Sequence, residues 1–431
     1  MWIKKILYFY LISLILISCG GLTGLGGRTG EEPKRRDNNK EKPNAFIINN
    51  SMKEFKPAIL HIKKSFLRKV LKTSSFDGIY CRIDSSEYPI QPIDSERFIL
   101  VVDLPPKKEI PVFIKKDITK INLWQKKAHA QFHERSVVIE NRKGNLKVSG
   151  GWIEKKHVIM HKNHKIHDGL YRFEGPGWES DKIAWRLYFD ERCAVDIFGK
   201  RKQGIVLPLI DLPGSKSYHE LSDWGMDILK VGDTLGAGGG GFWKGNKCYH
   251  FSKAEKIECI ISADGPVFAK VKLIFHGLIT PDNNRVNLTW EITTYSGCNF
   301  SKNKVYTQKG DWKGNFAAGL VKHTKSVEKN LFGKNRCFFV LSTWGPQALA
   351  PKPYKNLGLA IMAMDKDLEK NVITDNEAYL ISKKTREFVW WSAAFWSGGP
   401  NPPKNKKEFI EDISNICDML SCEFKIKEAN K

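Results

Sequence analysis

The chain has 431 residues and a formal net charge of +23 at neutral pH, with 70 Lys and Arg against 47 Asp and Glu. Its 13 Trp, 12 Tyr and 24 Phe supply enough large apolar side chains for one or two hydrophobic cores. None of the nine cysteines stands in Cys-x-x-Cys spacing, which argues against a zinc ribbon and a dithiol redox motif.

The first 19 residues have the layout of an export signal. Lys4 and Lys5 precede an apolar run at 6–17 that is short for a membrane span, and the sequence then reaches Ser18-Cys19. Leu-Ile-Ser-Cys resembles the lipobox of bacterial lipoproteins, in which the Cys is lipidated and becomes the mature N-terminus. We therefore expect a signal peptide over 1–19 and lipidation of Cys19, in preference to a signal anchor or core helix. Gly20 lacks an acidic retention cue, which favours the outer membrane.

Residues 20–45 are rich in Gly, Pro and charge and nearly devoid of large apolar side chains. Such a segment cannot offset the entropy of folding, so we expect a flexible tether. Export argues against nucleic acid as the partner of the positive charge. The remaining alternatives are an acidic polysaccharide, an anionic cell surface, or simply a solvated basic surface.

Strand patterns begin after the tether. Three β-rich runs, at 57–62, 97–104 and 109–114, predict a small N-terminal β unit over 46–120.

The segment 121–431 is also dominated by strand patterns, and we expect one β-sandwich body there. Short runs of apolar or alternating residues recur between turns at 137–141, 145–150, 183–189, 194–199, 255–262, 267–275, 286–294, 336–342, 358–364, 377–381 and 388–394. Only 404–420 shows convincing helical spacing, and no repeat typical of a propeller or solenoid is present. The sequence therefore predicts a mainly β fold, a large antiparallel β-sandwich with a C-terminal helix.

Eight cysteines remain after Cys19: Cys81, Cys193, Cys248, Cys259, Cys298, Cys337, Cys417 and Cys422. An exported location permits disulfides, but ordinary buried thiols are equally compatible with these positions.

Four histidines fall within eleven residues, at His157, His161, His164 and His167. The interleaved lysines would repel a cation, and no His-Glu-x-x-His is present. We therefore interpret the segment as an exposed loop and assign no metal; the sequence indicates no particular cofactor.

The densest polar chemistry lies in 217–230, just before the glycine-rich tract 236–241. The glycines predict an irregular loop whose backbone can approach a ligand. A carboxylate beside a His fixes the imidazole tautomer and raises its basicity, as general acid–base catalysis requires. The candidate catalytic residues are His219, Glu220, Asp223 and Asp227, and the candidate substrate contacts are Tyr218, Trp224 and Lys230. The alternative is that Trp224 and its apolar neighbours are core and the acids are solvated.

A second candidate group lies in 173–190. Gly-Pro-Gly-Trp predicts a rigid turn that presents Trp178 for stacking on a sugar ring, with Glu179 and Asp181 beside it. Arg186 could grip a substrate carboxylate with its planar guanidinium. The alternative is a packed Trp178 and an ion pair between Arg186 and Asp190.

Two later segments add one candidate each. The small-residue strand 317–323 ends in His323, which could point into a cleft or into solvent. The aromatic run 390–396 is partly core, but Trp396 stands beside Ser-Gly-Gly-Pro and is a candidate for a binding face.

Long runs at 174–190, 194–200 and 218–240, together with Gly-Leu-Val-Lys-His323, resemble a family of exported bacterial proteins that is known only as a domain of unknown function. Members are often met in glycan-utilisation gene clusters, and the resemblance covers most of the chain after the tether. It implies a β-rich body like the galactose-mutarotase supersandwich and a role in polysaccharide breakdown. It implies no catalytic residues, and the Lys-rich surface and the eight cysteines depart from the family's pattern.

The function we expect is a surface lipoprotein acting on an acidic glycan, held to the membrane by its lipid anchor alone. In a lyase, Arg186 or Lys230 would neutralise the uronate and His219 or His323 would remove the C5 proton. Tyr218 or the same His would then protonate the leaving oxygen. In a hydrolase, two carboxylates would come from Glu179, Asp181, Glu220, Asp223 and Asp227. The remaining alternative is a non-catalytic glycan-binding lipoprotein in which Trp178, Trp224 and Trp396 stack sugars. No P-loop, nucleophile elbow or dinucleotide fingerprint is present.

Overall fold

The computed structural model describes residues 41–308, 312–347 and 349–429. The predicted signal peptide, Cys19 and most of the predicted tether lie outside these ranges. Within them, no helix combines the length and the apolar character needed to cross a bilayer. Residues Pro43–Lys431 form one structural unit.

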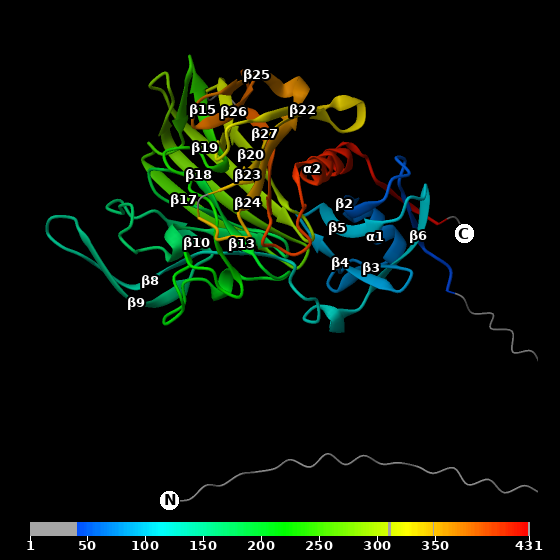
Figure 1. The fold of residues 1–431 in the computed structure, drawn as a ribbon. Helices are drawn as coiled ribbons and strands as arrows, with labels where there is room; N and C mark the ends of the chain where they lie inside the picture. The colour runs from blue at the N-terminus through cyan, green and yellow to red at the C-terminus, as the bar shows by residue number, and fades with distance from the viewer. Residues whose placement is uncertain (1–40, 309–311, 348, 430–431) are drawn as a thin grey trace, which may run out of the picture. The chain divides into compact units, whose positions relative to one another are not determined.

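A nine-stranded antiparallel sheet lies at the centre of this unit (Figure 1). Its strands, in spatial order, are β10 (His157–Ile159), β17 (Lys256–Asp264), β18 (Phe268–Ile279), β19 (Arg285–Tyr295), β20 (Phe300–Thr307), β27 (Glu387–Trp396), β24 (Asn356–Met364), β23 (Phe338–Pro346) and β22 (Glu328–Phe332).

One face of this sheet is buried, and the other is buried along β24 but only partly covered along β17 to β20. Along β24, Leu359 and Ile361 point into one core, whereas Ala360 and Met362 point into a second core on the opposite face. Alternation of this kind follows from the two-residue period of a strand. The runs at 255–262, 267–275 and 286–294 form strands with one partly exposed face, whereas the run at 358–364 forms β24, which has apolar residues on both faces.

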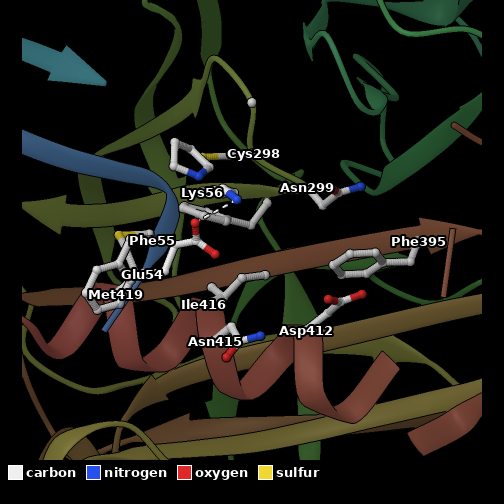
Figure 2. Close-up of a pocket in the computed structure, with 13 residues that line it drawn as sticks. Glu54, Phe55, Lys56, Cys298, Asn299, Phe395, Asp412, Asn415, Ile416 and Met419 are labelled. Carbon is white, nitrogen blue, oxygen red and sulfur yellow. Dashed lines mark ion pairs between the residues drawn. The ribbon is translucent and has the colours of Figure 1, made fainter. Parts of the chain in front are cut away.

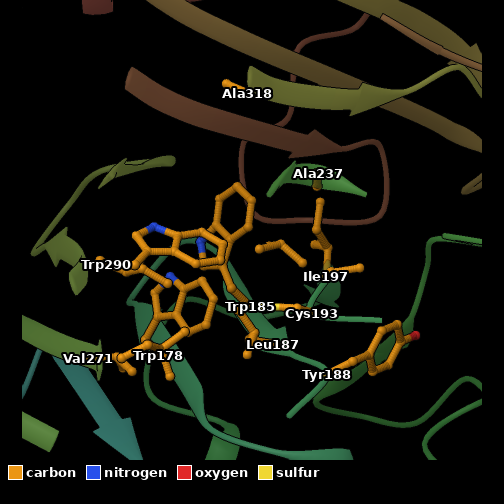
Figure 3. Close-up of a cluster of buried hydrophobic side chains, with 14 of the residues drawn as sticks. Trp178, Trp185, Leu187, Tyr188, Cys193, Ile197, Ala237, Val271, Trp290 and Ala318 are labelled. Carbon is orange, nitrogen blue, oxygen red and sulfur yellow. The ribbon is translucent and has the colours of Figure 1, made fainter. Parts of the chain in front are cut away.

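Two five-stranded sheets cover the first face. One consists of β14 (Gly225–Asp227), β13 (Val195–Lys200), β12 (Ala184–Leu187), β11 (Gly177–Ser180) and β7 (Ala128–Gln131). The other consists of β16 (Lys247–His250), β15 (Ala237–Lys244), β21 (Asn315–Val321), β26 (Glu377–Ser382) and β25 (Leu368–Ile373). Trp178, Trp185 and Trp290 meet in the core between these layers (Figure 3).

The second face packs against helix α2 (Lys406–Ser421) and a seven-stranded sheet. That sheet consists of β2 (Phe55–Lys63), β5 (Arg97–Leu104), β4 (Ser86–Pro92), β3 (Ile79–Ile83), β6 (Glu109–Lys116), β1 (Ala45–Ile48) and β28 (Lys425–Glu428). The C-terminal strand β28 pairs with β1, so the two ends of the folded chain close the same sheet edge. Helix α1 (Lys64–Leu71), which the strand patterns did not predict, follows β2 directly.

The prediction of a mainly β, antiparallel sandwich with a C-terminal helix is confirmed. The helix was predicted over 404–420 and begins two residues later, because the side chain of Asn405 caps it by accepting from the Glu408 N–H at 3.0 Å. The predicted runs at 137–141 and 145–150 fall in a two-stranded hairpin of β8 (His133–Glu140) and β9 (Leu146–Glu154). Short 3₁₀ turns occupy Ile118–Lys120, Arg172–Glu174, Leu207–Leu209, Lys334–Arg336 and Asp365–Asp367.

The expectation that the glycine tract is an irregular ligand loop is wrong. Most of the tract belongs to the buried strand β15, and Trp390 donates from its indole N–H to the Gly238 carbonyl at 2.8 Å. A Cβ on Gly238, which has a φ of 95°, would lie 2.3 Å from the Cβ of Ser392. The glycines therefore allow strand β27 to approach closely rather than a ligand.

All eight described cysteines are free thiols, so the alternative of ordinary thiols applies to the described part of the chain. Five of them, Cys81, Cys193, Cys259, Cys298 and Cys417, lie in the cores, where burial raises their pKa values above the ordinary range.

One buried carboxyl makes a prediction about stability. Glu377 of β26 accepts from the Leu235 N–H at 2.8 Å and the Tyr379 hydroxyl at 2.6 Å, and burial raises its pKa to about 7. A carboxyl whose folded pKa is raised contributes stability that is fully present below its unfolded pKa of about 4.3 and is lost as the pH rises through its folded value. We expect Glu377→Gln to remove this loss, so that the variant gains stability relative to wild type between about pH 5 and pH 8.

Urea denaturation at both pH values checks this expectation. The exposed Glu369 of the neighbouring strand β25 provides the control, because Glu369→Gln changes the charge equally without changing a buried group. A constant difference between Glu377→Gln and wild type across the pH range would contradict the assignment.

Candidate functional site

The sheet β14-β13-β12-β11-β7 separates apolar from charged side chains by simple alternation. Trp185, Leu187 and Ile197 face the sandwich core, and the intervening Arg186 and Asp196 face the other side of the sheet. Glu179 and Lys200 share that outer face.

Two loop segments cover this outer face and remove it from water. Phe173 from the turn at 172–174, and Leu207 and Ile210 from the segment after β13, form a small core against Phe198. Arg172 ties the two segments together by donating from Nε to the Ile210 carbonyl at 2.8 Å. Charged groups of the outer face are therefore buried although they point away from the main core.

A buried ion cluster occupies this covered face. Arg186 lies opposite Asp196 in the strand register and donates to its Oδ2 from Nε at 3.0 Å and from Nη2 at 2.6 Å. The same Nη2 donates to Oδ2 of Asp227, on the neighbouring strand β14, at 2.7 Å. Arg186 is only 2% exposed, so these charges interact with little screening by solvent.

The pKa values of the cluster reflect burial and mutual charge. Burial, followed by repulsion from Asp227, raises the pKa of Asp196 to about 6. Burial lowers the pKa of Arg186, but attraction to the two carboxylates outweighs it and raises that pKa well above its usual value. Tyr188 donates its hydroxyl to Asp196 Oδ2 at 2.6 Å, and burial raises the phenol pKa far above normal.

Two exposed imidazoles stand at the two ends of this cluster. His219 places Nδ1 3.3 Å from Asp227 Oδ2, and His167 places Nδ1 2.7 Å from Glu174 Oε1. Glu174 Oε2 in turn lies 3.7 Å from Nη1 of Arg186, a buried nitrogen that has no hydrogen-bond partner in the described structure. The arrangement is two histidine–carboxylate pairs that share one buried guanidinium.

The two histidines at the ends of the cluster are accessible to solvent, as proton transfer to a substrate requires. The His219 side chain is 61% exposed and that of His167 is 74% exposed. The hydrogen bond to Asp227 raises the pKa of His219, an effect that desolvation only partly offsets. An imidazole that is oriented by a carboxylate and titrates near neutral pH can act as a general acid or base.

Tyr218 lies beside His219 with a ring-centroid separation of 4.4 Å. The guanidinium of Arg186 lies 5.1 Å from the Tyr218 ring, and burial raises the pKa of the Tyr218 phenol. A neutral phenol next to an imidazole can donate a proton to a substrate oxygen.

The backbone that carries Glu174 is strained. Phe173 and Glu174 have φ values of 40° and 70°, and His167 has a φ of 61°, all in the left-handed region that non-glycine residues avoid. Such strain persists where surrounding contacts enforce it, often at functional sites. Arg192 supplies one such contact by donating to Glu174 Oε1 at 3.0 Å.

Four residues that the sequence proposed as site residues come together here: Arg186, Tyr218, His219 and Asp227. Arg186 requires a correction of role, because its Nε and Nη2 are committed to Asp196 and Asp227 and do not face a substrate. The alternative pairing of Arg186 with Asp190 is also wrong, since Asp190 binds Arg192 instead.

The other candidates from the segment 217–230 are close to His219 in sequence, but they take no part in the described contacts of the ion cluster. The side chains of Glu220, Asp223 and Lys230 are exposed. Trp224 is half-buried and packs edge-on against Phe198, with ring centroids 5.9 Å apart, so it belongs to the small core that covers the sheet.

Two proposed sugar-stacking tryptophans are core residues. Trp178 is 1% exposed and donates its indole N–H to Ser301 at 2.9 Å; Figure 3 shows it among Trp185, Trp290 and Val271. Trp396 is also buried and donates to the Tyr354 carbonyl at 2.7 Å. Strand β11 already begins at Gly177, so Trp178 lies inside a buried strand and not at the tip of the predicted Gly-Pro-Gly turn.

The acids beside Trp178 are structural. Glu179 forms a buried ion pair with Lys200 and accepts from the N–H groups of Val206 and Leu207 at 2.9 and 2.8 Å. Asp181 accepts from the Gly297 N–H at 2.6 Å. His323 contacts the Leu357 carbonyl at 3.0 Å and the Thr343 hydroxyl at 3.2 Å, and no residue of the ion cluster. The hypothesis that His323 shares a cleft with His219 and Arg186 therefore has no support in these contacts.

The histidine-rich segment is held by carboxylates. His157 binds Glu258, His161 lies near Glu140, His164 binds Asp168 and His167 binds Glu174. No group of three or more His, Cys, Asp or Glu suited to a metal was found in the described residues. His164 is buried, so the segment is not uniformly exposed as expected.

Sequence reasoning missed Glu174, Tyr188 and Asp196 as partners of Arg186, and it missed His167 as the partner of Glu174. One signal was available: Asp196 is a single carboxylate inside the apolar run 194–198, and a charge in such a strand requires a buried partner. His167 and Glu174 carried no comparable signal, because a strained loop brings them together.

Two cavities lie elsewhere in the unit and share Lys56, Pro57 and Gly297. The smaller, of about 350 Å³, is bordered by Phe395 of β27 and by Asp412 and Asn415 of α2 (Figure 2). The larger, of about 650 Å³, is bordered by Tyr88, Trp124 and several lysines. Neither includes a residue of the ion cluster.

Comparison with known proteins gives a family but no characterised relative. The family model described as "Domain of unknown function (DUF4861)" matches residues 47–426. The search of curated proteins found no match.

Several solved structures are similar in part. An alpha-mannosidase from Enterococcus faecalis V583 is 9% identical with a TM-score of 0.38, covering 90% of this chain and 46% of that one. A protein in glycosyl hydrolase family 38 from Enterococcus faecalis is 8% identical with a TM-score of 0.41, covering 90% and 48%. A candidate aldose 1-epimerase from Klebsiella pneumoniae is 9% identical with a TM-score of 0.31, covering 66% and 94%. The chain spans about half the length of the first two proteins.

The buried cluster predicts a stability effect. Arg186→Met leaves Asp196 and Asp227 buried without their cation, which should cost about 3–5 kcal/mol near neutral pH. The raised pKa of Asp196 means that the folded state holds a proton more readily than the unfolded chain. The stability that protonation of Asp196 contributes is fully present below the pKa of Asp196 in the unfolded chain and is lost as the pH rises through about 6. This loss grows in Arg186→Met, because the ionised Asp196 then lacks its cation. The deficit should therefore be smaller at about pH 5 than at about pH 8.

Urea denaturation at the two pH values measures the deficit. Arg285→Met is the matched control, because Arg285 forms an exposed ion pair with Glu255, and its removal should change stability little. Equal, small effects of both substitutions would contradict the structural role of Arg186.

The His219–Asp227 contact predicts a titration. The imidazole pKa of His219, measured by NMR, should lie above its ordinary value of about 6.5, and Asp227→Asn should bring it down toward that value. The His157 resonance is the internal control, since its carboxylate partner is Glu258 and should be unaffected. An unchanged His219 pKa in Asp227→Asn would show that the contact does not control this imidazole.

Proposed function

The chain belongs to the DUF4861 family, and we propose that it is an enzyme that cleaves an acidic polysaccharide by β-elimination. The observation that carries the proposal is the exposed His219, oriented by Asp227 on the buried Arg186 and placed beside the phenol of Tyr218. Base and acid thus stand next to each other, the imidazole exposed and the phenol half-buried, each with a pKa that its surroundings explain.

The chemistry requires a base, an acid and neutralisation of a carboxylate. The neutral His219 imidazole takes the C5 proton of a uronate, the C4–C5 double bond forms, and the C4–O bond breaks. The Tyr218 phenol donates a proton to the departing oxygen, and the imidazolium returns its proton to the phenolate by way of solvent. The reaction consumes no co-reactant.

Arg186 has a positioning role in this proposal. Its guanidinium fixes Asp227, and Asp227 fixes the Nδ1 side of His219, which leaves Nε2 to face the substrate. Of the two cations proposed for the uronate, Lys230 remains, because it is exposed on the segment that follows β14. The net charge of +23 supports attraction of a polyanion in general.

Three of the five carboxylates proposed for hydrolysis are held by other partners, which leaves the exposed Glu220 and Asp223 of one loop as the remaining pair. Hydrolysis needs two carboxyl groups that flank the bond, but Glu179 is bound by Lys200 and two backbone N–H groups. Asp227 is bound by Arg186 and His219, and Asp181 by a backbone N–H. The binding-only alternative loses two of its three aromatic contacts, because Trp178 and Trp396 are buried.

We also propose that the protein is exported and lipid-anchored through Cys19, and that polysaccharide is its partner. The basic residues, the apolar run and Leu-Ile-Ser-Cys at 16–19 support this proposal. Metabolic labelling with a fatty-acid analogue, with Cys19→Ala as the control, would test the anchor.

A product assay tests the proposed reaction. The protein without its first 40 residues is incubated with a panel of uronate-containing polysaccharides, and ultraviolet absorbance of unsaturated uronate is recorded together with reducing ends. We expect both to rise, and His219→Ala to lower the rate by about 10²–10⁴-fold, as is typical for loss of a general base. Tyr218→Phe should lower it as well, and the rate of wild type should rise as the pH passes the raised pKa of His219.

His157→Ala is the matched control, because His157 is another exposed imidazole on a carboxylate but lacks a buried arginine. Equal losses in His157→Ala and His219→Ala, or full activity in His219→Ala, would place the reaction elsewhere. Reducing ends without absorbance would indicate hydrolysis, and no product from any acidic glycan would refute the proposed activity.

A further inference from the structure

The larger cavity lies where the seven-stranded sheet meets the sandwich, away from the ion cluster. Its walls come from β4 and β5 of the seven-stranded sheet, from the segment at 124–127, and from the turn between β11 and β12. A volume of about 650 Å³ is within the usual range of small-ligand sites.

Two ammonium groups at this cavity have no counter-ion in the described residues. Lys127 and Lys182 line the cavity, and no described carboxylate lies within ion-pair distance of either. Lys56, by contrast, is paired with Glu54 at 2.7 Å. Unpaired ammoniums at a concave surface provide hydrogen-bond donors for a ligand.

The same cavity offers an acceptor. Asp103 lines it, and burial raises its carboxyl pKa while Lys56, Lys127 and Lys182 act in the opposite direction. Asp181 also lines it, but its carboxylate is occupied by the Gly297 N–H. Because the carboxylates and ammoniums are nearly balanced, the cavity suits a ligand rich in hydroxyl groups rather than a bare anion.

Two aromatic side chains complete the lining. Trp124 and Tyr88 are half-buried, so part of each ring stays accessible. The Trp124 ring is supported from the side by Tyr80, with ring centroids 6.0 Å apart. An aromatic face held in this way can pack on the apolar C–H face of a sugar ring while polar groups bind its hydroxyls.

A second cavity adjoins the first. It shares Lys56, Pro57 and Gly297 with the larger one and adds Asn299, Asp412 and Asn415 over an apolar floor that includes Phe395 (Figure 2). These amide and carboxyl groups can also bind hydroxyls. Two adjoining cavities with the same chemistry have room for more than one ring.

We propose that these two cavities form an oligosaccharide-binding groove, with Trp124 as the stacking platform and Lys127, Lys182 and Asp103 as the hydroxyl and carboxylate contacts. The groove is separate from the residues proposed for catalysis, since it contains none of Glu174, Arg186, Tyr218 and His219. The inference rests on the proposed function for its ligand class. In this proposal the groove binds sugar rings of the polysaccharide that are distant from the bond that is cleaved.

The test measures binding without turnover. His219→Ala protein is titrated by calorimetry with oligogalacturonate and with a neutral gluco-oligosaccharide of equal length. We expect at least one of them to bind, and Trp124→Ala to weaken that binding by about tenfold or more. Lys127→Ala/Lys182→Ala should weaken the oligogalacturonate more than the neutral sugar.

Two control variants separate the groove from general effects. Tyr249→Ala removes a comparably accessible aromatic ring on β16, and Lys329→Ala/Lys370→Ala removes two exposed lysines that line neither cavity. Both double lysine variants lower the net charge equally. If the control pair weakens binding as much as the groove pair, binding is a general charge effect and the inference is wrong.

Other outcomes are equally decisive. No binding of either oligosaccharide, or full binding in Trp124→Ala, overturns the groove even if the product assay succeeds. Binding that depends on Trp124, in a protein that forms no product from any glycan, supports the groove and refutes the proposed elimination. Circular dichroism of each variant establishes that it is folded.

Discussion

The two cores on either side of the nine-stranded sheet are the constraint on which the rest of the structure depends. Leu359 and Ile361 on one face of β24, and Ala360 and Met362 on the other, leave this strand no surface for polar chemistry. Charged side chains are found where the second face is only partly covered, as with Lys270 and Glu291, on the outer faces of the covering sheets and in the loops. The sheet that contains β12 and β13 shows this most clearly, because alternation sends Trp185 to the core and Arg186 to the opposite side.

Arg186 faces outward and yet is buried, since loops cover that face of the sheet. A buried guanidinium without partners would be very unfavourable, so Asp196 and Asp227 are needed to hold it. The cluster therefore requires the neighbouring strands β12, β13 and β14 to pair so that Arg186, Asp196 and Asp227 meet. This requirement gives Asp227 a fixed position at the sheet edge, from which it can orient an exposed histidine.

The strand pattern and the two polar stretches could be predicted from the sequence, because apolar periodicity and dense charge are local properties. The segments 173–190 and 217–230 did supply Arg186, Tyr218, His219 and Asp227. Glu174 was not found, because its role depends on a strained turn that one sequence does not display. Asp196 is recognisable as a lone carboxylate in an apolar run, but only the strand register shows that Arg186 is its partner. Trp178 and Trp396 were misjudged for a related reason: glycines and prolines beside an indole indicate a turn but not the residue at which the next strand begins.

The arrangement around Arg186 also links its two ends. His219 and His167 each bind a carboxylate, and each of these carboxylates faces the same guanidinium. The buried charges act together on the pKa of His219: the hydrogen bond to Asp227 raises it, desolvation and the charge of Arg186 lower it, and the charge of Asp196 raises it. Low exposure at the centre limits screening of these charges, whereas high exposure at the two histidines gives solvent access for proton exchange. The pKa of His219 thus depends on the whole cluster, and this is the physical reason to regard the cluster, rather than His219 alone, as one unit.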